Sequence, residues 1–264
     1  MRNDQKTLSV VVPAYNETEV IATCYRRRAD VMARLDNYEY ELIFVDDGSQ
    51  DGSFEKLIGL QQKAPSLNVI RFSRNFGHQI AITAGIDYAT GAVAVIIDAD
   101  LQDPPEVISE MVSKWEQSYD VVYGVREKRD DESLLKLATA STFYRLLRRF
   151  TNIEIPVYIG DFRLTSARAA NQLKQFREKD RFIRGLVSWI GFPQTGVLYH
   201  REERFAGDTK FPFNKMAEFA LDGITSFSSV PLKFASWLGF FDLAAGLFFI
   251  FVQRLHPESD GNYR

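Results

Sequence analysis

Apolar runs alternate with polar, helix-forming stretches along the first half of the chain. The apolar runs predict strands at 8–14, 40–47, 68–73, 92–100 and 119–125. Helices are expected between them at 17–35, 51–64 and 78–89, with a fourth beginning at Pro104-Pro105. This alternation predicts an α/β fold, in which a mostly parallel sheet is flanked by helices on both faces.

The pattern is weaker after residue 125. We expect a basic amphipathic helix at 132–150, a helix near 167–176 and a strand at 195–205. In 213–228, apolar residues recur every three or four positions, which predicts an amphipathic helix. Such a stripe suits either core packing or a membrane interface, and the pattern leaves both open.

Residues 234–252 form an apolar run with one charged residue, Asp242. At about 1.5 Å per residue, a helix of this length roughly crosses a hydrocarbon core of about 30 Å. We therefore expect a transmembrane helix, with a buried soluble helix as the alternative. Asp242 facing lipid would cost about 3 kcal/mol, so we expect it to face a partner helix. Lys233 and Arg254 bracket the run, so its orientation stays open.

Composition excludes some classes of protein. The 264 residues are 45% hydrophobic, which supports a sizeable core, and the net charge of −3 argues against a general nucleic-acid coat. Cys24 has no second cysteine to pair with, which fits a reducing compartment. The hydrophilic N-terminus lacks the apolar core of a secretory signal, so we expect none.

Three polar clusters follow predicted strands: "YNE" at 15–17, "DDGS" at 46–49 and "DADLQD" at 98–103. Ligands of parallel α/β sheets bind beyond the carboxyl ends of the strands. The clusters therefore predict a ligand site at that edge. A dinucleotide or P-loop site is not favoured, because neither glycine-rich motif is present, and the three histidines lack zinc-ligand spacing.

The most specific chemistry lies in the third cluster. Side chains alternate along a strand, so Asp98 and Asp100 are expected to share a face, which Gln102 continues. Paired carboxylates suit Mg²⁺ or Mn²⁺ bound together with a diphosphate. Asp103, before Pro104-Pro105 and Glu106, is expected to cap the next helix instead.

Several motifs, in order, resemble the polyprenyl-phosphate glycosyltransferases, family two enzymes with the GT-A fold. They are "VVVPAYNE", "FVDDGSQDGS", "RNFGHQIAITAGIDYATGAVAVIIDADLQDPPE", "YIGDFRLTS", "RFIRGLVSWIGF" and "REERFAGDTKF". The bactoprenol glucosyltransferases and dolichol-phosphate mannose synthases are the most similar members. The resemblance covers roughly residues 8–230.

The resemblance implies inverting transfer of a hexose from a nucleotide sugar to a polyprenyl phosphate. UDP-glucose is favoured as the donor, with GDP-mannose as an alternative. The nucleotide site would contain Pro13, Tyr15, Glu17, Asp47 and Asp98. Mg²⁺ or Mn²⁺ would be held by Asp98, Asp100 and Gln102, and Asp100 would act in catalysis.

The acceptor side is also implied by the resemblance. Asp161 is the acidic residue near the acceptor, and a surface acid paired with Arg163 is its structural alternative. The lipid phosphate would be bound by Arg126, Arg145, Arg201, Arg204 and Lys210. A phosphate acceptor is already largely ionised at neutral pH, because its second pKa is about 6. Whether Asp161 acts as a base or orients the acceptor is therefore open.

The resemblance also implies an organisation and a location. We expect a catalytic domain at 1–210, an interfacial helix at 211–230, a transmembrane helix at 231–254 and a polar tail at 255–264. The catalytic domain would lie at the cytoplasmic face of the inner membrane, in a homo-oligomer. Bacterial members usually carry two transmembrane helices, so we expect this sequence to be truncated, joined across missing residues or engineered.

Two alternatives remain at this point. A polysaccharide synthase would share the fold, but the Q-x-x-R-W signature typical of that class is not found. A catalytically inactive membrane scaffold that binds sugar nucleotides is the second. The intact Asp98, Asp100, Gln102 and Asp161 argue against it.

Overall fold

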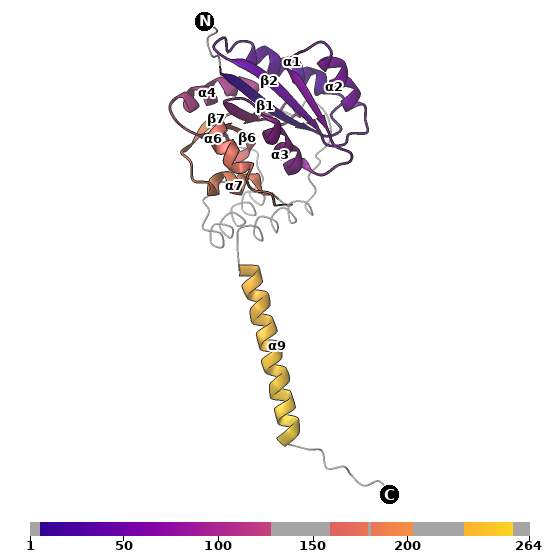
Figure 1. Ribbon diagram of the computed structural model, residues 1–264, viewed down its shortest axis with the longest axis vertical. Coiled ribbons are helices and arrows are strands. Elements are labelled where there is room, and N and C mark those ends of the chain that lie inside the picture. The colour runs from indigo at the N-terminus through magenta and orange to yellow at the C-terminus, as the bar shows by residue number, and fades with distance from the viewer. Residues whose placement is uncertain (1–5, 128–158, 179–180, 203–229, 256–264) are drawn as a thin grey trace.

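A computed structural model describes residues 6–127, 159–178, 181–202 and 230–255 (Figure 1). The helices expected at 132–150 and 213–228 lie outside these ranges. The strands are β1 (Thr7–Ala14), β2 (Glu39–Asp46), β3 (Leu67–Arg71), β4 (Val93–Ile96), β5 (Val121–Arg126), β6 (Ile159–Ser166) and β7 (Gln194–Tyr199). The helices are α1 (Ile21–Met32), α2 (Ser53–Gln61), α3 (His78–Tyr88), the 3₁₀ turn η1 (Pro105–Val107), α4 (Ile108–Glu116), α6 (Ala167–Leu173), α7 (Ile183–Trp189) and α9 (Val230–Leu255).

The seven strands form one sheet in the order β3-β2-β1-β4-β6-β5-β7. Neighbouring strands are parallel except at β6, which runs antiparallel to both β4 and β5. The mostly parallel sheet is therefore confirmed. Because β6 is reversed, its first residues lie at the rim where β4 and β5 end, and Val125 of β5 pairs with Ile159.

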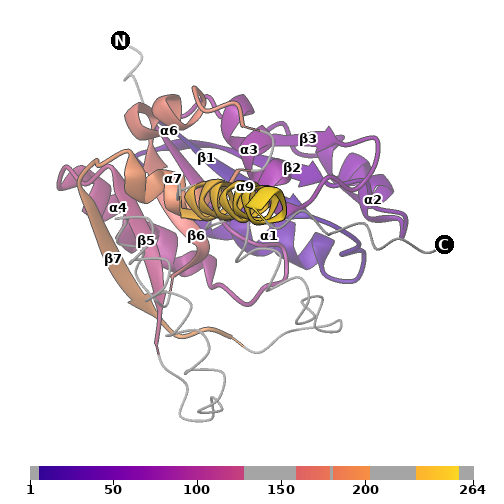
Figure 2. The same ribbon diagram turned by 90° about the horizontal axis from the view of Figure 1, so that it is seen from below.

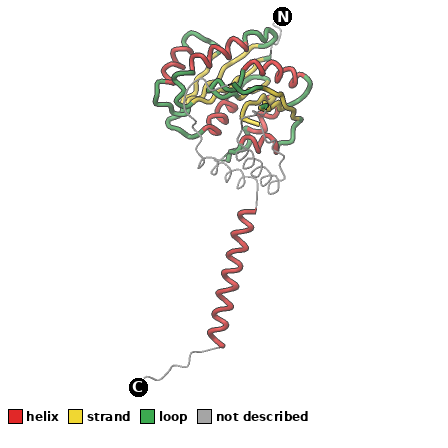
Figure 3. The backbone as a smooth tube through the Cα atoms, turned by 180° about the vertical axis from the view of Figure 1, so that it is seen from behind, coloured by secondary structure: helices red, strands yellow, loops and turns green. Residues whose placement is uncertain are grey.

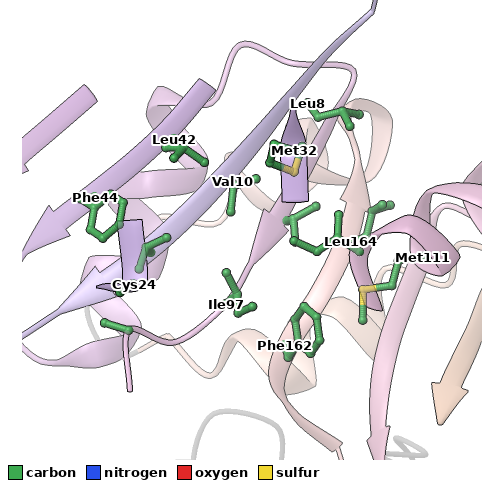
Figure 4. Packing of buried hydrophobic residues seen from close by; sticks show 14 of the residues in the cluster. Leu8, Val10, Cys24, Met32, Leu42, Phe44, Ile97, Met111, Phe162 and Leu164 are labelled. Atoms are coloured by element: carbon green, nitrogen blue, oxygen red, sulfur yellow. The ribbon is translucent and has the colours of Figure 1, made fainter. Parts of the chain in front are cut away.

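Helices cover both faces of the sheet (Figures 2 and 3). Alternate residues of β1 point to opposite faces, as the pleat of a strand requires. Val10 and Val12 pack in the larger cluster with residues of α1, α2 and α4. Figure 4 shows Val10 of this cluster with Cys24 and Met111. Val11 packs on the other face, with residues of α3, α6 and α7. Helices packed on both faces of the sheet therefore fix the position of the rim at which the strands end.

Several element bounds differ from those expected. The first helix begins at Ile21 rather than residue 17, and a turn precedes it in which the N–H groups of Val20 and Ile21 donate to the carbonyl of Glu17. The strand expected to reach residue 100 ends at Ile96, and the strand expected to reach residue 205 ends at Tyr199.

Helix α9 extends away from the sheet in Figure 1. It covers the whole predicted span, and Leu232–Leu255 is long and apolar enough to cross a membrane. Its side chains from Leu232 onward are exposed, including Asp242. The core helix of a soluble domain is mostly buried, whereas these apolar side chains of α9 are exposed.

Candidate active site at the rim of the sheet

The segment that follows β4 carries the acidic cluster. It leaves the sheet after Ile96, and Leu101 adopts a positive φ of 60°. Ala99 and Leu101 are buried, whereas Asp98, Asp100 and Gln102 are partly exposed. The expected shared exposure of these three side chains is observed, but a turn rather than a strand produces it. Oδ1 of Asp100 accepts a hydrogen bond from the N–H of Gln102 at 3.1 Å.

A buried arginine that the sequence patterns did not predict holds the backbone at Asp98. The guanidinium of Arg28, fully buried on α1, donates to the carbonyls of Cys24 and Asp98. This anchors the backbone at the point where the acidic segment turns. The Asp98 carboxylate is thereby held at the rim.

His78 joins the carboxylates of two strands. It is the first residue of α3, and its Nε2 lies 3.5 Å from Oδ1 of Asp98 and 3.2 Å from Oδ2 of Asp161. Asp98 follows β4, whereas Asp161 belongs to β6. One imidazole therefore spans the two sides of the predicted site, although no role was assigned to it from the sequence. The glycine before it, at the start of a helix in "RNFGHQ", was the available signal.

Asp161 is buried and engaged by a second unpredicted residue. Arg184 of α7 approaches it with both arms: Nε lies 2.9 Å from Oδ1 and Nη2 lies 2.9 Å from Oδ2. Arg163 is more distant, at 3.8 Å, and donates to the carbonyls of Gly160 and Asp161. The alternative was a surface acid paired with Arg163: the pairing is present as the longer contact, but Asp161 is buried rather than at the surface.

The charges at this cluster shift three pKa values. Burial favours the neutral form of Asp161, but Arg184 and His78 outweigh it and hold its pKa well below the usual range. Burial opposes the charged form of His78, yet Asp98 and Asp161 together raise its pKa to about 9. Burial, only partly offset by His78, raises the pKa of Asp98 to about 6. Of the two aspartates, Asp161 therefore keeps its charge to lower pH.

Asp47 organises the loop that presents His78. Its two carboxylate oxygens accept hydrogen bonds from the N–H groups of Phe76 and Gly77 at 2.7 and 2.9 Å. Gly77 has a φ of 103°, a conformation that favours glycine. Asp47 was predicted for the nucleotide. A carboxylate offers about four acceptor positions, so these two bonds leave others unused, and Asp47 is itself buried.

The other nucleotide residues lie at the ends of β1 and β2. Pro13 is buried within β1, and Tyr15 follows the strand with 37% of its surface exposed. The N–H of Glu17 donates to Ser53 Oγ, which ties the loop after β1 to the start of α2. Asp51 accepts from the N–H groups of Thr18 and Ser53 in the same region. The two loops thus form one rigid edge.

Asp103 differs from its predicted role. It makes no cap, because Pro104 remains extended and the 3₁₀ turn starts one residue later. Its side chain is fully buried and accepts a hydrogen bond from the Tyr199 hydroxyl at 2.6 Å. Arg126 and Arg201 both lie 3.8 Å from it, and Arg201 lies 3.8 Å from Asp100 as well.

The structure brings most predicted residues to one rim. Arg126 and Arg201 meet at Asp103, beside the acidic segment. The other three residues predicted for the lipid phosphate lie outside the described residues: Arg145, Arg204 and Lys210.

The predicted ligand set is compatible with a divalent cation. Within the described ranges, no three His, Cys, Asp or Glu side chains are grouped to hold a metal. Asp98 and Asp100 supply carboxylates and Gln102 an amide oxygen, the donors that Mg²⁺ and Mn²⁺ prefer. Oδ1 of Asp98 is buried and accepts no hydrogen bond from the described residues. His78 faces this oxygen at 3.5 Å, beyond close hydrogen-bond contact, so Oδ1 retains an acceptor position that a cation could use.

Comparison with known proteins agrees with this geometry. The sequence model described as "Glycosyl transferase family 2" matches residues 9–174, from β1 through α6. The chain belongs to this family. Its α/β sheet and the solved structures that it resembles confirm the GT-A fold, and the family makes it a transferase.

Individual relatives have more specific names than the family description. "Uncharacterized glycosyltransferase YkcC" of Bacillus subtilis is 52% identical over 92% of this chain and 75% of the relative. "Prophage bactoprenol glucosyl transferase homolog" of Escherichia coli is 40% identical over 88% of this chain and 76% of the relative. The mannosyltransferase PcManGT from Pyrobaculum calidifontis, in complex with GDP-Man and Mn²⁺, superimposes with a TM-score of 0.55. It is 18% identical and is matched over 80% of this chain and 60% of its own.

Proposed function

We propose that this protein transfers glucose from UDP-glucose to a polyprenyl phosphate, with inversion at the anomeric carbon. The observation that carries the proposal is the convergence of Asp98 and Asp161 on His78, within 3.5 and 3.2 Å. It places the acidic turn after β4 beside a buried carboxylate from β6. The relatives named bactoprenol glucosyl transferase, at 38–40% identity, support this choice of sugar and acceptor.

The nucleotide would lie against the loops after β1 and β2. Pro13, Tyr15 and Glu17 line this edge, and Asp47 stands beside it at the end of β2. Asp98, Asp100 and Gln102 would hold Mg²⁺ or Mn²⁺ next to the diphosphate. When bound, such an ion stabilises the negative charge that develops on the leaving diphosphate.

Asp161 is proposed to orient groups rather than to abstract a proton. Both of its oxygens are occupied by the guanidinium of Arg184, a bidentate geometry that stabilises the carboxylate. The acceptor phosphate is already largely ionised at neutral pH and needs little help from a base. A fixed negative charge at this position would stabilise positive charge developing on the sugar.

We place the protein at the cytoplasmic face of the inner membrane. The exposed apolar surface of α9 supports membrane attachment. The proposed organisation is a catalytic domain at 1–210, an interfacial helix at 211–230, a transmembrane helix at 231–254 and a polar tail at 255–264. Asp242 in the apolar helix supports a homo-oligomer, because an acidic side chain in lipid requires a partner.

A transfer assay tests this function. Purified full-length protein is incubated with Mn²⁺, undecaprenyl phosphate and radiolabelled UDP-glucose, and the organic phase is counted. We expect labelled lipid, which disappears when EDTA replaces Mn²⁺ and when undecaprenyl phosphate is omitted. A parallel arm with GDP-mannose distinguishes mannosyl transfer. Absence of organic-phase label with every nucleotide sugar tested would contradict the proposal and favour the inactive scaffold.

A further inference from the structure

Two glycines in neighbouring strands make room for one pair of side chains. A Cβ on Gly124 of β5 would lie 2.7 Å from the ring of Tyr199. A Cβ on Gly160 of β6 would lie 2.6 Å from Nη2 of Arg126. The ring and the guanidinium therefore fill spaces that a larger residue would close. Nε of Arg126 also donates to the Tyr199 hydroxyl at 3.2 Å.

Asp103 lies at the centre of this arrangement. Its Oδ1 accepts from the Tyr199 hydroxyl and faces both Arg126 and Arg201 at 3.8 Å. Its Oδ2 is buried and has no hydrogen-bond partner among the described residues, and the same holds for Nε of Arg201. One buried carboxylate thus faces two arginines without closing a tight pair with either. Asp100 is the other carboxylate near Arg201, also at 3.8 Å.

Arg201 is held at this place by the chain around it. The N–H of Glu202 donates to the carbonyl of Gln102 at 2.9 Å. Arg27 of α1 pairs with both Glu106 and Glu202 and so ties α1, η1 and the end of β7 together. These contacts fix Arg201 against the acidic segment. About 30% of the Arg126 side chain and 31% of the Arg201 side chain remain exposed and accessible to a ligand.

We propose that Asp103 is a positioning residue that holds Arg126 and Arg201 in place to bind the phosphate of the acceptor. The Tyr199 hydroxyl shares this task. Planar guanidinium groups bind phosphate oxygens through paired N–H donors, and their orientation decides the strength of binding. This role rests on the proposed transfer to a lipid phosphate.

The order of strands separates this phosphate from that of the donor. The predicted nucleotide loops follow β1 and β2 on one side of β4, and the acidic turn follows β4 itself. Arg126 ends β5 and Arg201 follows β7, on the other side of β4. A donor that reaches from the β1–β2 loops to the metal leaves the β5–β7 side to the acceptor. Arg201 faces Asp100 across that boundary.

The test uses Gly160→Ala, which moves Arg126 without removing a charge. The new Cβ meets the far end of a flexible side chain, so the guanidinium must shift while the fold is kept. Gly59→Ala is the matched control, because nothing lies within 4 Å of a Cβ at that position. Asp103→Asn and Tyr199→Phe are the second and third variants. Melting temperatures report on folding.

Two readouts separate the possible phosphates. KM values are measured for undecaprenyl phosphate and for UDP-glucose in the transfer assay. Binding of farnesyl phosphate in detergent, and of UDP with Mn²⁺, is measured by titration calorimetry. We expect Gly160→Ala and Asp103→Asn to weaken the lipid-phosphate arm about 10-fold, the loss expected for a charge-assisted hydrogen bond. The UDP arm should stay within about twofold, and Gly59→Ala should match the wild type in both.

Each outcome of these measurements either supports or contradicts the proposed role of Asp103. Weakening of the UDP arm, alone or in parallel, would overturn the proposal and assign the arginines to the donor diphosphate. Unchanged binding of both ligands in Gly160→Ala and Tyr199→Phe would also overturn it, even if Asp103→Asn fails to fold. If the wild type transfers no sugar but binds farnesyl phosphate in a manner sensitive to Gly160→Ala, the proposed function fails and the phosphate site stands.

Discussion

Asp161 and Asp103 are both buried carboxylates that face arginines at the same rim, yet their surroundings differ. Arg184 grips Asp161 with two contacts of 2.9 Å. Arg126 and Arg201 stay 3.8 Å from Asp103, whose nearest partner is the neutral hydroxyl of Tyr199. In the first cluster, the carboxylate binds the guanidinium of Arg184 closely. In the second, the guanidinium groups of Arg126 and Arg201 remain partly available to a ligand.

The difference indicates that the two clusters have different functions. A closed bidentate pair fixes the position and charge of the carboxylate, which suits stabilisation of a charge that develops during a reaction. A loosely held pair of arginines keeps donors free to meet an anionic ligand. The following predictions test this division, in order of decreasing effect.

Asp161→Asn should have the largest effect. Loss of the fixed charge is expected to lower kcat by about 10²–10³-fold, the usual cost of removing one preorganised electrostatic group. Binding of UDP with Mn²⁺ should stay near the wild-type value, because Asp161 lies on the acceptor side. Transfer kinetics and titration calorimetry measure the two quantities. A loss of UDP binding would contradict this placement.

Asp100→Ala should abolish the dependence of nucleotide binding on metal. Asp100 is proposed as a carboxylate ligand, and its removal leaves Asp98 and an amide to hold the ion. We expect the residual UDP affinity to be the same with Mn²⁺ and with EDTA, and turnover to fall by at least about 10²-fold. A metal response equal to that of the wild type would return Asp100 to a structural role, closing the turn with Gln102.

The same substitution in each cluster provides a direct comparison. Arg184→Lys removes one arm of the grip on Asp161, and kcat should fall about 10-fold with little change in either KM. Arg201→Lys keeps the charge but loses the planar group, and the KM for undecaprenyl phosphate should rise about threefold to 10-fold. If both variants changed the same kinetic constant, the two clusters would have to be treated as one.

Asp120 and Arg168 form an Asp–Arg pair at the opposite rim and should affect stability alone. Asp120 also accepts a hydrogen bond from Ser166 Oγ at 2.7 Å. Arg168, opposed by burial and aided by Ser166, lowers the pKa of Asp120. Its stabilising contribution is therefore present above the unfolded-state pKa of about 4 and lost as pH falls through the lower folded value.

Asp120→Asn should accordingly flatten the acid side of the stability profile. We expect the melting temperature at pH 7 to fall by about 2–4 °C, because Ser166 keeps only a weaker neutral acceptor. The difference from the wild type should shrink progressively as pH is lowered from about 5. Thermal scans across pH measure this. A change in kcat or in either KM would contradict a purely structural role.

The sequence patterns predicted the five alternating strands and the rim that gathers the acidic clusters, because each depends on local periodicity. They did not predict that β6 inserts between β4 and β5, since the partners of a strand depend on contacts far apart in the chain. Asp103 shows the same limit. Its local context favoured a helix cap, but Pro104 stays extended and Tyr199, 96 positions away, takes the carboxylate instead.

The cluster at Asp161 shows which site residues can be identified from the sequence and which cannot. Asp98 and Asp161 were named as site residues, and both reach the rim. His78 and Arg184 were not, because the sequence offered no spacing that linked them to either aspartate. Side chains from α3 and α7 meet β6 only after the sheet is assembled.

The reversed direction of β6 has an evolutionary consequence. Since β5 ends and β6 begins at the same rim, Glu127 and Ile159 both lie at the rim where the substrates are proposed to bind. Insertions or deletions there can lengthen or shorten that connection without altering the ladder that joins β4, β6 and β5. Changes in the length of this connection are therefore expected to leave the sheet and its rim in place.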